Sequence, residues 1–345
     1  MSVPARVDPP GTCIDHVRFY VHDLEASVKE LVTGYGMEHL AEQGADAGRT
    51  VAVGAGRIRL LLTEPSPQDT RGRSFLDRHG DGAADIALRV PDAAEAHARA
   101  AGGGARSIAE PVRQGDRVTA VVSGFGDVVH SLVQYPPGRA PGPRPGRSGE
   151  PDLQAIDHVA VCLEPGSLDS TAAFYEAAFG LRPAFSDRTV VGGQAMRSTA
   201  VQHPERAVTF TLLEPDPGLA PGQIDEFLAG NRGPGVQHLA LGTPNIVEAV
   251  GRLTRRSVGF LGAPDAYYRL LSERIRLCRH STESLRELGV LVDADQDGLL
   301  FQIFARSTHP RGTYFFELVE RCGARTFGGG NIRALYEALA ADQAG

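Results

Sequence analysis

Three polar side chains interrupt apolar, strand-like segments in the second half of the chain. His158 lies in "IDHVAVCL", His238 in "GPGVQHLALG" and Glu317 in "TYFFELVER". A lone histidine among apolar residues is usually a hydrogen-bonded core residue, but burying an unpaired carboxylate is costly, so Glu317 needs a cation nearby. Two imidazoles and one carboxylate on one face of an octahedral metal leave positions open for a substrate and dioxygen. That is the arrangement of non-haem Fe(II) oxygenases.

The three residues are far apart in sequence, so only the fold can bring them together. They are separated by 80 residues (238 − 158) and 79 residues (317 − 238). Alternate residues of a strand point to the same face. The expected same-face neighbours are Ile156 and Ala160 for His158, Val236 and Ala240 for His238, and Phe315 and Val319 for Glu317. From spacing alone, three unrelated buried polar residues stay the alternative to a shared metal.

The chain also contains an internal duplication. "IDHV" occurs at 14–17 and again at 156–159, and "GDGAADIALR" (80–89) matches "GPGVQHLALG" (233–242). A weaker echo pairs "DVVHSLVQY" with "TYFFELVER". The first copy keeps His16 but has Asp85 and Ser131 opposite His238 and Glu317. We therefore expect a repeated scaffold with one working site; a weak metal site at His16 and Asp85 is the alternative.

A proline- and glycine-rich stretch separates the two copies. "PPGRAPGPRPGRSGEP" cannot hold a helix or strand, so we expect a linker at 136–151 between domains 1–135 and 152–345. Both halves begin with a strand and a helical segment, "LEASVKELVTGYGMEHL" and "DSTAAFYEAAFGLRPAF". The best strands of the second half are "IDHVAVCL", "VTFTLLEP", "QHLALG", "LLFQIF" and "YFFELVE". "VDADQDG" lacks the closing Glu of a calcium loop and predicts a polar hairpin turn.

Composition excludes several function classes. The 345 residues carry a net charge of −7 with no Lys/Arg run, which argues against a nucleic-acid partner. No apolar stretch approaches the roughly 20 residues of a membrane helix, and the start has no apolar signal region. The four cysteines are scattered without a CxxC pair, which fits reduced thiols in the cytoplasm. A homo-oligomer is left open.

Longer segments resemble a known family. "GPGVQHLAL", "LLFQIFARSTHPRGTYFFELVER" and "TFGGGNIRALYEAL" are similar to the 4-hydroxyphenylpyruvate dioxygenase family, which includes 4-hydroxymandelate synthases. The resemblance implies an α+β vicinal-oxygen-chelate fold: two domains of repeated βαβββ modules, the C-terminal one an open barrel around the metal. It also implies His158, His238 and Glu317 as Fe(II) ligands, and an aryl pyruvate and O2 as substrates.

Three positions bear on which product of the family is formed. Where the ring-oxidising dioxygenases typically read Pro-Ile-Asn-Glu-Pro, this chain has Thr211 and Leu213 at the Pro and Asn positions, and Ile332 replaces a Phe after Gly-Asn. Without the Phe ring at 332 and the Asn amide at 213, the substrate has room to turn its benzylic carbon toward the metal. The pattern favours oxidative decarboxylation and benzylic hydroxylation to 4-hydroxymandelate; the alternative is homogentisate formation. Replacing Ile332 by Phe should then shift some product toward ring oxidation.

The resemblance also implies individual substrate contacts. Ser198, Thr211 and Gln302 resemble catalytic polar groups that touch the substrate, and each has an ordinary strand residue as its alternative. Gln223 resembles a pocket hydrogen-bonding residue or a surface turn. Phe304, Phe315 and Phe327 resemble aromatic walls of the pocket, or core residues. Arg197 stands where relatives usually have Asn, and strand alternation would point it away from Ser198.

The C-terminal segment resembles a lid. Gly328, Gly329 and Gly330 predict a flexible hinge, and Asn331 is a candidate helix cap. The apolar residues Ile332, Leu335, Tyr336 and Leu339 recur at helical spacing. A plain packing helix is the alternative. A ligand-binding protein without a metal, or another metal enzyme on the same fold, are the rival functions.

Overall fold

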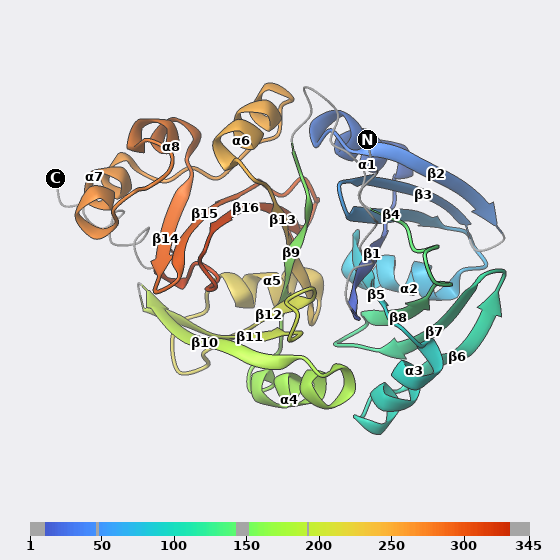
Figure 1. The fold of residues 1–345 in the computed structure, drawn as a ribbon. Helices are drawn as coiled ribbons and strands as arrows, with labels where there is room; N and C mark the ends of the chain where they lie inside the picture. Colours follow the sequence, from blue (N-terminus) through green and yellow to red (C-terminus); the bar gives the residue numbers. More distant parts are fainter. Residues whose placement is uncertain (1–10, 46–47, 143–151, 192, 332–345) are drawn as a thin grey trace.

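The computed structural model describes residues 11–45, 48–142, 152–191 and 193–331. Two curled sheets of eight strands each form the framework of the structure (Figure 1). The two sheets span 13–134 and 155–322, so they fall in the two halves that the duplication indicates. The division at 136–151 stays a prediction. Within the described ranges no helix combines the length and apolar character needed to cross a membrane.

The first half contains one sheet with its helices on the outer face. Its elements are β1 (Cys13–Tyr20), α1 (Leu24–Lys29), the π-helical turn η1 (Glu30–Gly34), β2 (Glu38–Ala45), β3 (Gly48–Ala55), β4 (Ile58–Pro65), α2 (Thr70–His79), β5 (Gly82–Arg89), α3 (Ala93–Gly102), β6 (Ser107–Gln114), β7 (Arg117–Ser123) and β8 (Val129–Gln134). The strand order is β2-β3-β4-β1-β5-β8-β7-β6.

The second half repeats that order and adds two α-helices, α7 and α8, between α6 and β14. Its elements are β9 (Ala155–Cys162), α4 (Leu168–Phe179), β10 (Arg182–Val191), β11 (Gln194–Gln202), β12 (Thr209–Pro215), α5 (Gln223–Asn231), β13 (Gly235–Gly242), α6 (Ile246–Arg255), α7 (Asp265–Arg274), α8 (Thr282–Leu288), β14 (Leu291–Asp295), β15 (Gly298–Phe304) and β16 (Phe315–Cys322). The order is β10-β11-β12-β9-β13-β16-β15-β14.

Each sheet is built from two modules that meet at its centre. In the second sheet β12 and β9 are parallel, β9 and β13 are antiparallel, and β13 and β16 are parallel. The first sheet has the same pattern at β4, β1, β5 and β8. The predicted repeat of βαβββ modules is therefore confirmed. Because β10 and β14 are the two edges of the second sheet, its barrel is open.

The sequence explains where the helical segments end. The first predicted segment divides into α1, η1 and the start of β2, and Asp23 caps α1 by accepting from the backbone N–H of Ala26. The second becomes α4, which ends at Gly180 with φ 70°, and β10 begins two residues later. A left-handed glycine is a common helix terminator. Both predicted segments therefore run too far into strands.

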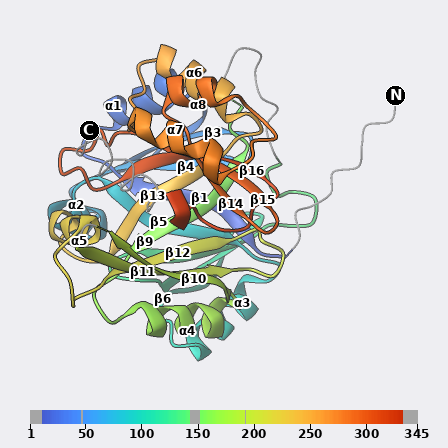
Figure 2. The same cartoon turned by 90° about the vertical axis from the view of Figure 1, so that its left-hand side faces the viewer.

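The two halves pack on each other through buried contacts. α3 and α4 lie side by side (Figures 1 and 2). They are so close that a Cβ added at Gly103 would lie 2.5 Å from the backbone nitrogen of Ala178. Beside them His130 of β8 is fully buried and lies 2.8 Å from the hydroxyl of Tyr175 on α4. The halves thus share one continuous core.

The predicted polar turn at 292–298 is confirmed. β14 and β15 form an antiparallel hairpin in which Asp295 pairs with Gly298. The Asp295 carboxylate accepts four backbone N–H groups, from Asp297, Gly298, Arg325 and Thr326. Asp295 therefore ties the hairpin to the segment that follows β16.

Candidate metal centre

The three predicted ligands converge on one point inside the second barrel. His158 on β9, His238 on β13 and Glu317 on β16 are buried, and their ligand atoms lie within 4.8 Å of one another. Glu317 Oε2 is 3.2 Å from His158 Nε2 and 3.3 Å from His238 Nε2. Ala240 on β13 pairs with both His158 and Glu317, and its small side chain leaves room between them.

Two β-bulges place the histidines, and they overturn part of the alternation argument. The register of β9 and β13 shifts at Asp157 and again at Gln237. A bulge adds one residue to a strand and reverses the alternation beyond it. Ile156 and Val236 therefore pack with the outer core cluster and not beside the histidines. The predictions for these two neighbours are wrong, whereas Ala160 and Ala240 do line the interior.

The bulged residues fix which ring nitrogen carries the proton in the neutral form of each histidine. Asp157 Oδ1 lies 2.9 Å from His158 Nδ1, and Gln237 Oε1 lies 3.1 Å from His238 Nδ1. A carboxylate or amide oxygen can only accept, so in each neutral ring Nδ1 donates and the lone pair is on Nε2. Both lone pairs then face Glu317. This is how partners beyond the ligands usually orient a metal-binding imidazole.

The charges of the group also fit a cation. Burial alone would lower the pKa of His158, but Asp157 and Glu317 outweigh it and raise the pKa to about 9. Burial lowers the pKa of His238, whose neighbour is a neutral amide. Burial would raise the pKa of Glu317, but the two histidines bring it down to about 2. Glu317 Oε2 is buried without a hydrogen-bond partner, so the residues present suit a metal ion there.

Aromatic rings surround the two histidines. Phe315 stacks on His238 at 5.1 Å between ring centroids, and Phe304 meets the same ring at 6.0 Å. Phe327 contacts His158 edge to face at 5.1 Å. All three predicted aromatic residues therefore lie beside the ligands. They form an apolar wall that limits access of water to the group.

The interior also holds polar atoms without partners. Thr211 on β12 lies beside Ala160 of β9, and its buried Oγ1 has no hydrogen-bond partner. The buried Oε1 of Gln302 on β15 is also unpaired. Ser198 pairs with Leu213 across β11 and β12, and the two side chains share the interior face with Thr211. Unpaired buried polar atoms are costly, so these atoms can bond a molecule bound in the interior.

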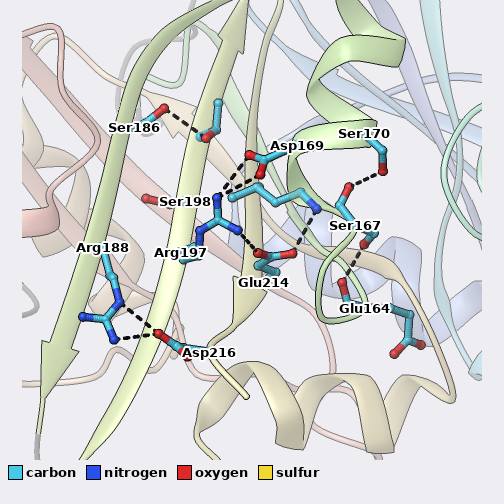
Figure 3. Close-up of polar contacts among 12 residues, drawn as sticks. Glu164, Ser167, Asp169, Ser170, Ser186, Arg188, Arg197, Ser198, Glu214 and Asp216 are labelled. Carbon is cyan, nitrogen blue, oxygen red and sulfur yellow. Dashed lines mark hydrogen bonds and ion pairs between the residues drawn. The ribbon is translucent and has the colours of Figure 1, made fainter. Parts of the chain in front are cut away.

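Arg197 points away from this interior. Its guanidinium bonds Glu214 at 2.7 Å and Asp169 at 3.1 Å, on the outer face toward α4 (Figure 3). Glu214 also accepts from the backbone N–H of Leu168 at the start of α4. Arg197 therefore anchors α4 to the sheet, as strand alternation predicts, and does not approach Ser198.

Other predicted residues lie elsewhere. Gln223 is the exposed first residue of α5, which favours its surface alternative. The prediction that Asn331 caps a following helix is wrong, because residues 329–331 are already helical. The hydroxyl of Tyr267 instead donates to Asn331 Oδ1 at 2.8 Å. Ile332 and the remaining residues of the predicted lid helix lie outside the described residues.

The three glycines before Asn331 meet three polar side chains. A Cβ at Gly328, where φ is +77°, would lie 2.0 Å from Gln302 Oε1. A Cβ at Gly329 would lie 2.8 Å from Asp187 of β10, and one at Gly330 would lie 2.3 Å from Asp293 of β14. Glycine is thus required here by close packing as well as by backbone conformation. The segment spans the gap between the two edges of the barrel.

The first half shows what replaces the metal group when the ligands are absent. Asp85 accepts from both the backbone N–H (2.9 Å) and the hydroxyl (2.5 Å) of Ser131. Arg18 takes the strand position of Ala160 and donates to Thr63 at 2.8 Å. His16 keeps its partner Asp15. Hydrogen bonds among the chain's own residues fill this interior, which argues against the alternative site at His16 and Asp85.

Sequence reasoning missed the partners of the ligands. Asp157, Gln237 and Arg321 were not among the predicted residues, although Arg321 binds Asp157 with two hydrogen bonds of 2.7 and 2.8 Å. One signal was present, because an Asp precedes the first histidine in both copies of "IDHV". The first copy has Ala84 at the position of Gln237, so the repeat did not indicate a partner for His238.

Comparisons with known proteins agree with this architecture. Family models described as the Glyoxalase/Bleomycin resistance protein/Dioxygenase superfamily match residues 155–303 and 15–122. The 4-hydroxyphenylpyruvate dioxygenase of Danio rerio is 31% identical over 95% of this chain and 90% of its own length; that of Dictyostelium discoideum is 29% identical over 95% and 97%.

A solved structure extends the similarity. A triply substituted 4-hydroxymandelate synthase from Streptomyces coelicolor superimposes with a TM-score of 0.86 at 42% identity. The match covers 97% of this chain and 100% of that one. The predicted vicinal-oxygen-chelate fold is thereby confirmed, and the chain belongs to the 4-hydroxyphenylpyruvate dioxygenase family.

Proposed function

We propose that this protein uses Fe(II) and O2 to convert 4-hydroxyphenylpyruvate into 4-hydroxymandelate and CO2. The observation that carries the proposal is the buried group of His158 Nε2, His238 Nε2 and Glu317 Oε2, which offers a metal three ligands from the described part of the chain. Such a set suits Fe(II) that must also bind a 2-oxo acid and dioxygen. Relatives named as 4-hydroxyphenylpyruvate dioxygenases and as a 4-hydroxymandelate synthase support the substrate class.

The bound iron would supply the oxygen chemistry, and the chain would supply orientation and exclusion of water. Asp157 and Gln237 hold the two imidazoles with Nε2 toward the metal position. Phe304, Phe315 and Phe327 would bound the substrate's ring on its apolar side.

The unpaired atoms of Gln302 and Thr211, together with the Ser198 hydroxyl, would orient the rest of the substrate. Gln302 Oε1 can accept a hydrogen bond from the substrate, whereas the hydroxyls of Ser198 and Thr211 can both donate and accept one. Because these groups are fixed on strands, they can hold the substrate in one orientation relative to the metal.

The choice of product would depend on the interior beside Leu213. Its apolar side chain packs with Ala160 and Cys162, so this part of the interior offers the substrate no amide. A ring without a polar anchor there can turn until its benzylic carbon faces the metal. Homogentisate formation, with attack on the ring, is the second candidate, because the relatives from Danio rerio and Dictyostelium discoideum are named 4-hydroxyphenylpyruvate dioxygenases.

One incubation separates the two products. The Fe(II)-loaded protein is mixed with 4-hydroxyphenylpyruvate in air, and CO2 release and the aromatic product are followed. The two products are isomers, so they must be resolved by chromatographic retention against authentic standards. We expect 4-hydroxymandelate. Homogentisate as the main product would overturn the assignment of product, and absence of CO2 release would overturn the reaction class.

A further inference from the structure

Arg321 lies at the centre of a set of contacts behind His158. Its Nε and Nη2 donate to Oδ2 and Oδ1 of Asp157 at 2.7 and 2.8 Å, and Asp157 Oδ1 accepts from His158 Nδ1 at 2.9 Å. A two-point bond between guanidinium and carboxylate fixes the plane of the carboxylate as well as its position. The orientation of the His158 ring therefore depends on where Arg321 is held.

The same guanidinium holds the segment that follows β16. Its Nη1 donates to the carbonyl oxygens of Ala324 (3.1 Å) and Thr326 (2.8 Å). It also lies 4.9 Å from the ring centre of Phe327, which contacts His158 from the other side. Both neighbours that restrain the His158 ring, Asp157 and Phe327, are thus arranged by one side chain.

The outer side of this arrangement faces solvent. A surface hollow of about 350 Å³ is bordered by Asp157, Arg321 and Phe327, while His158 behind them is only 3% exposed. The ion pair and the Phe327 ring therefore form the wall between solvent and the metal ligand. Loss of the wall would both free the imidazole and admit water.

The first half contains a similar ion pair without the ligand group, in which Arg89 donates twice to the single oxygen Oδ1 of Asp15. Asp15 accepts from His16 Nδ1 at 2.9 Å, and Arg89 donates to Asp15 at 3.0 and 3.2 Å. Arg89 also donates to the carbonyl of Pro141. Because Arg89 resembles Arg321 in its bonds but has no His-His-Glu group beside it, it is an internal control for stability alone.

We propose that Arg321 is a positioning residue for the metal centre. Its guanidinium holds Asp157 and residues 324–327 against His158. Metal affinity and the packing of residues 324–327 over His158 therefore depend on the same side chain. This inference rests on the proposed function only through the metal itself. Lys cannot replace Arg321 fully, because one ammonium cannot bond the carboxylate in two places and both carbonyls at once.

The test compares three variants by metal binding. Metal-free parent, Arg321→Met, Arg321→Lys and Arg89→Met proteins are titrated with Co(II), followed by its visible absorption, and their thermal unfolding is recorded without metal. We expect Arg89→Met to bind Co(II) like the parent and Arg321→Met to bind it about 10- to 100-fold more weakly, as for other partners of metal-bound histidines. Arg321→Lys should lie between them, and it decides the question if Arg321→Met does not fold.

A second measurement follows the closing segment. Amide hydrogen exchange of residues 324–327 should slow when Co(II) binds the parent, and this protection should be lost in Arg321→Met. Equal Co(II) affinity in Arg321→Met (or in Arg321→Lys, if only that variant folds) and Arg89→Met would overturn the inference and leave Arg321 a purely structural residue. A parent protein that binds no Co(II) would instead overturn the metal centre on which the proposed function depends.

Discussion

At the scale of single residues, the molecule separates two uses of the same strand positions. His238 and Glu317 leave lone pairs facing one point, and Glu317 Oε2 has no hydrogen-bond partner. Their counterparts Asp85 and Ser131 bond each other at 2.5 Å. Asp85 and Ser131 meet their hydrogen-bonding needs with each other, whereas the buried Glu317 carboxylate lacks a partner that a metal ion can supply. The two halves share one strand arrangement, and they differ in the side chains at these positions.

The first prediction tests this difference with matched variants. His238→Ala removes one of the two imidazole ligands, so metal binding and CO2 release from 4-hydroxyphenylpyruvate should both be lost. His16→Ala changes the first-half counterpart of the other imidazole, His158, and should leave metal stoichiometry and turnover near the parent's. Metal content of the purified, Fe(II)-loaded proteins and CO2 release measure both. Full turnover by His238→Ala would remove His238 from the ligand set.

The second prediction concerns the choice of product. Leu213→Asn returns an amide to the interior face that Leu213 shares with Ser198. The amide would anchor the substrate in a different rotation, so part of the product should become homogentisate, whereas Leu213→Met should leave the product unchanged. Chromatography against both standards gives the ratio. An identical ratio in the two variants would show that polarity at this position does not direct the oxidation.

At the scale of elements, five strands of the second sheet were accessible from the sequence because apolar runs mark them, and the family resemblance implied the βαβββ modules. β9, β12, β13, β15 and β16 were all predicted. The bulges at Asp157 and Gln237 were not, because a bulge depends on how two strands pair and leaves no periodic signal in either. The convergence of His158, His238 and Glu317 was thus predictable, whereas the side chains that orient the two histidines were not.

The third prediction concerns the glycine segment. Gly328→Ala must displace Gln302 and force an L-residue into positive φ, so turnover should fall at least about tenfold while Co(II) affinity stays near the parent's. Gly166→Ala is the control, because Gly166 has a similar φ of +81° with nothing within 4 Å of an added Cβ. Steady-state kinetics and Co(II) titration report the two effects. Equal loss in both variants would mean that backbone strain alone is responsible.

At the scale of the whole molecule, the halves are joined through a buried histidine. His130 Nδ1 donates to the carbonyl of Ile86 and Nε2 accepts from the hydroxyl of Tyr175, which fixes the neutral ring. Burial lowers the pKa of His130, although the nearby Asp85 charge opposes the shift. In the unfolded chain His130 is protonated below the ordinary histidine pKa of about 6.5. In the folded protein it stays neutral to lower pH.

The fourth prediction follows from the sign of that shift. Because the unfolded state binds more protons, the free energy of unfolding should fall as pH drops below about 6.5. His130→Gln cannot titrate, so its stability should decline less steeply than the parent's over the same pH range. Tyr175→Phe leaves Nε2 unpaired and should lose about 1–3 kcal/mol. Denaturant unfolding at several pH values measures both, and parallel parent and His130→Gln curves would contradict the assignment.

The location of bound iron tests the central claim most directly. Crystals of the Fe(II)-loaded protein, kept free of oxygen, are measured on both sides of the iron absorption edge. We predict a single strong anomalous peak within coordination distance of His158 Nε2, His238 Nε2 and Glu317 Oε2, and none near His16. A peak in the first half, or no peak at these three atoms, would contradict the account.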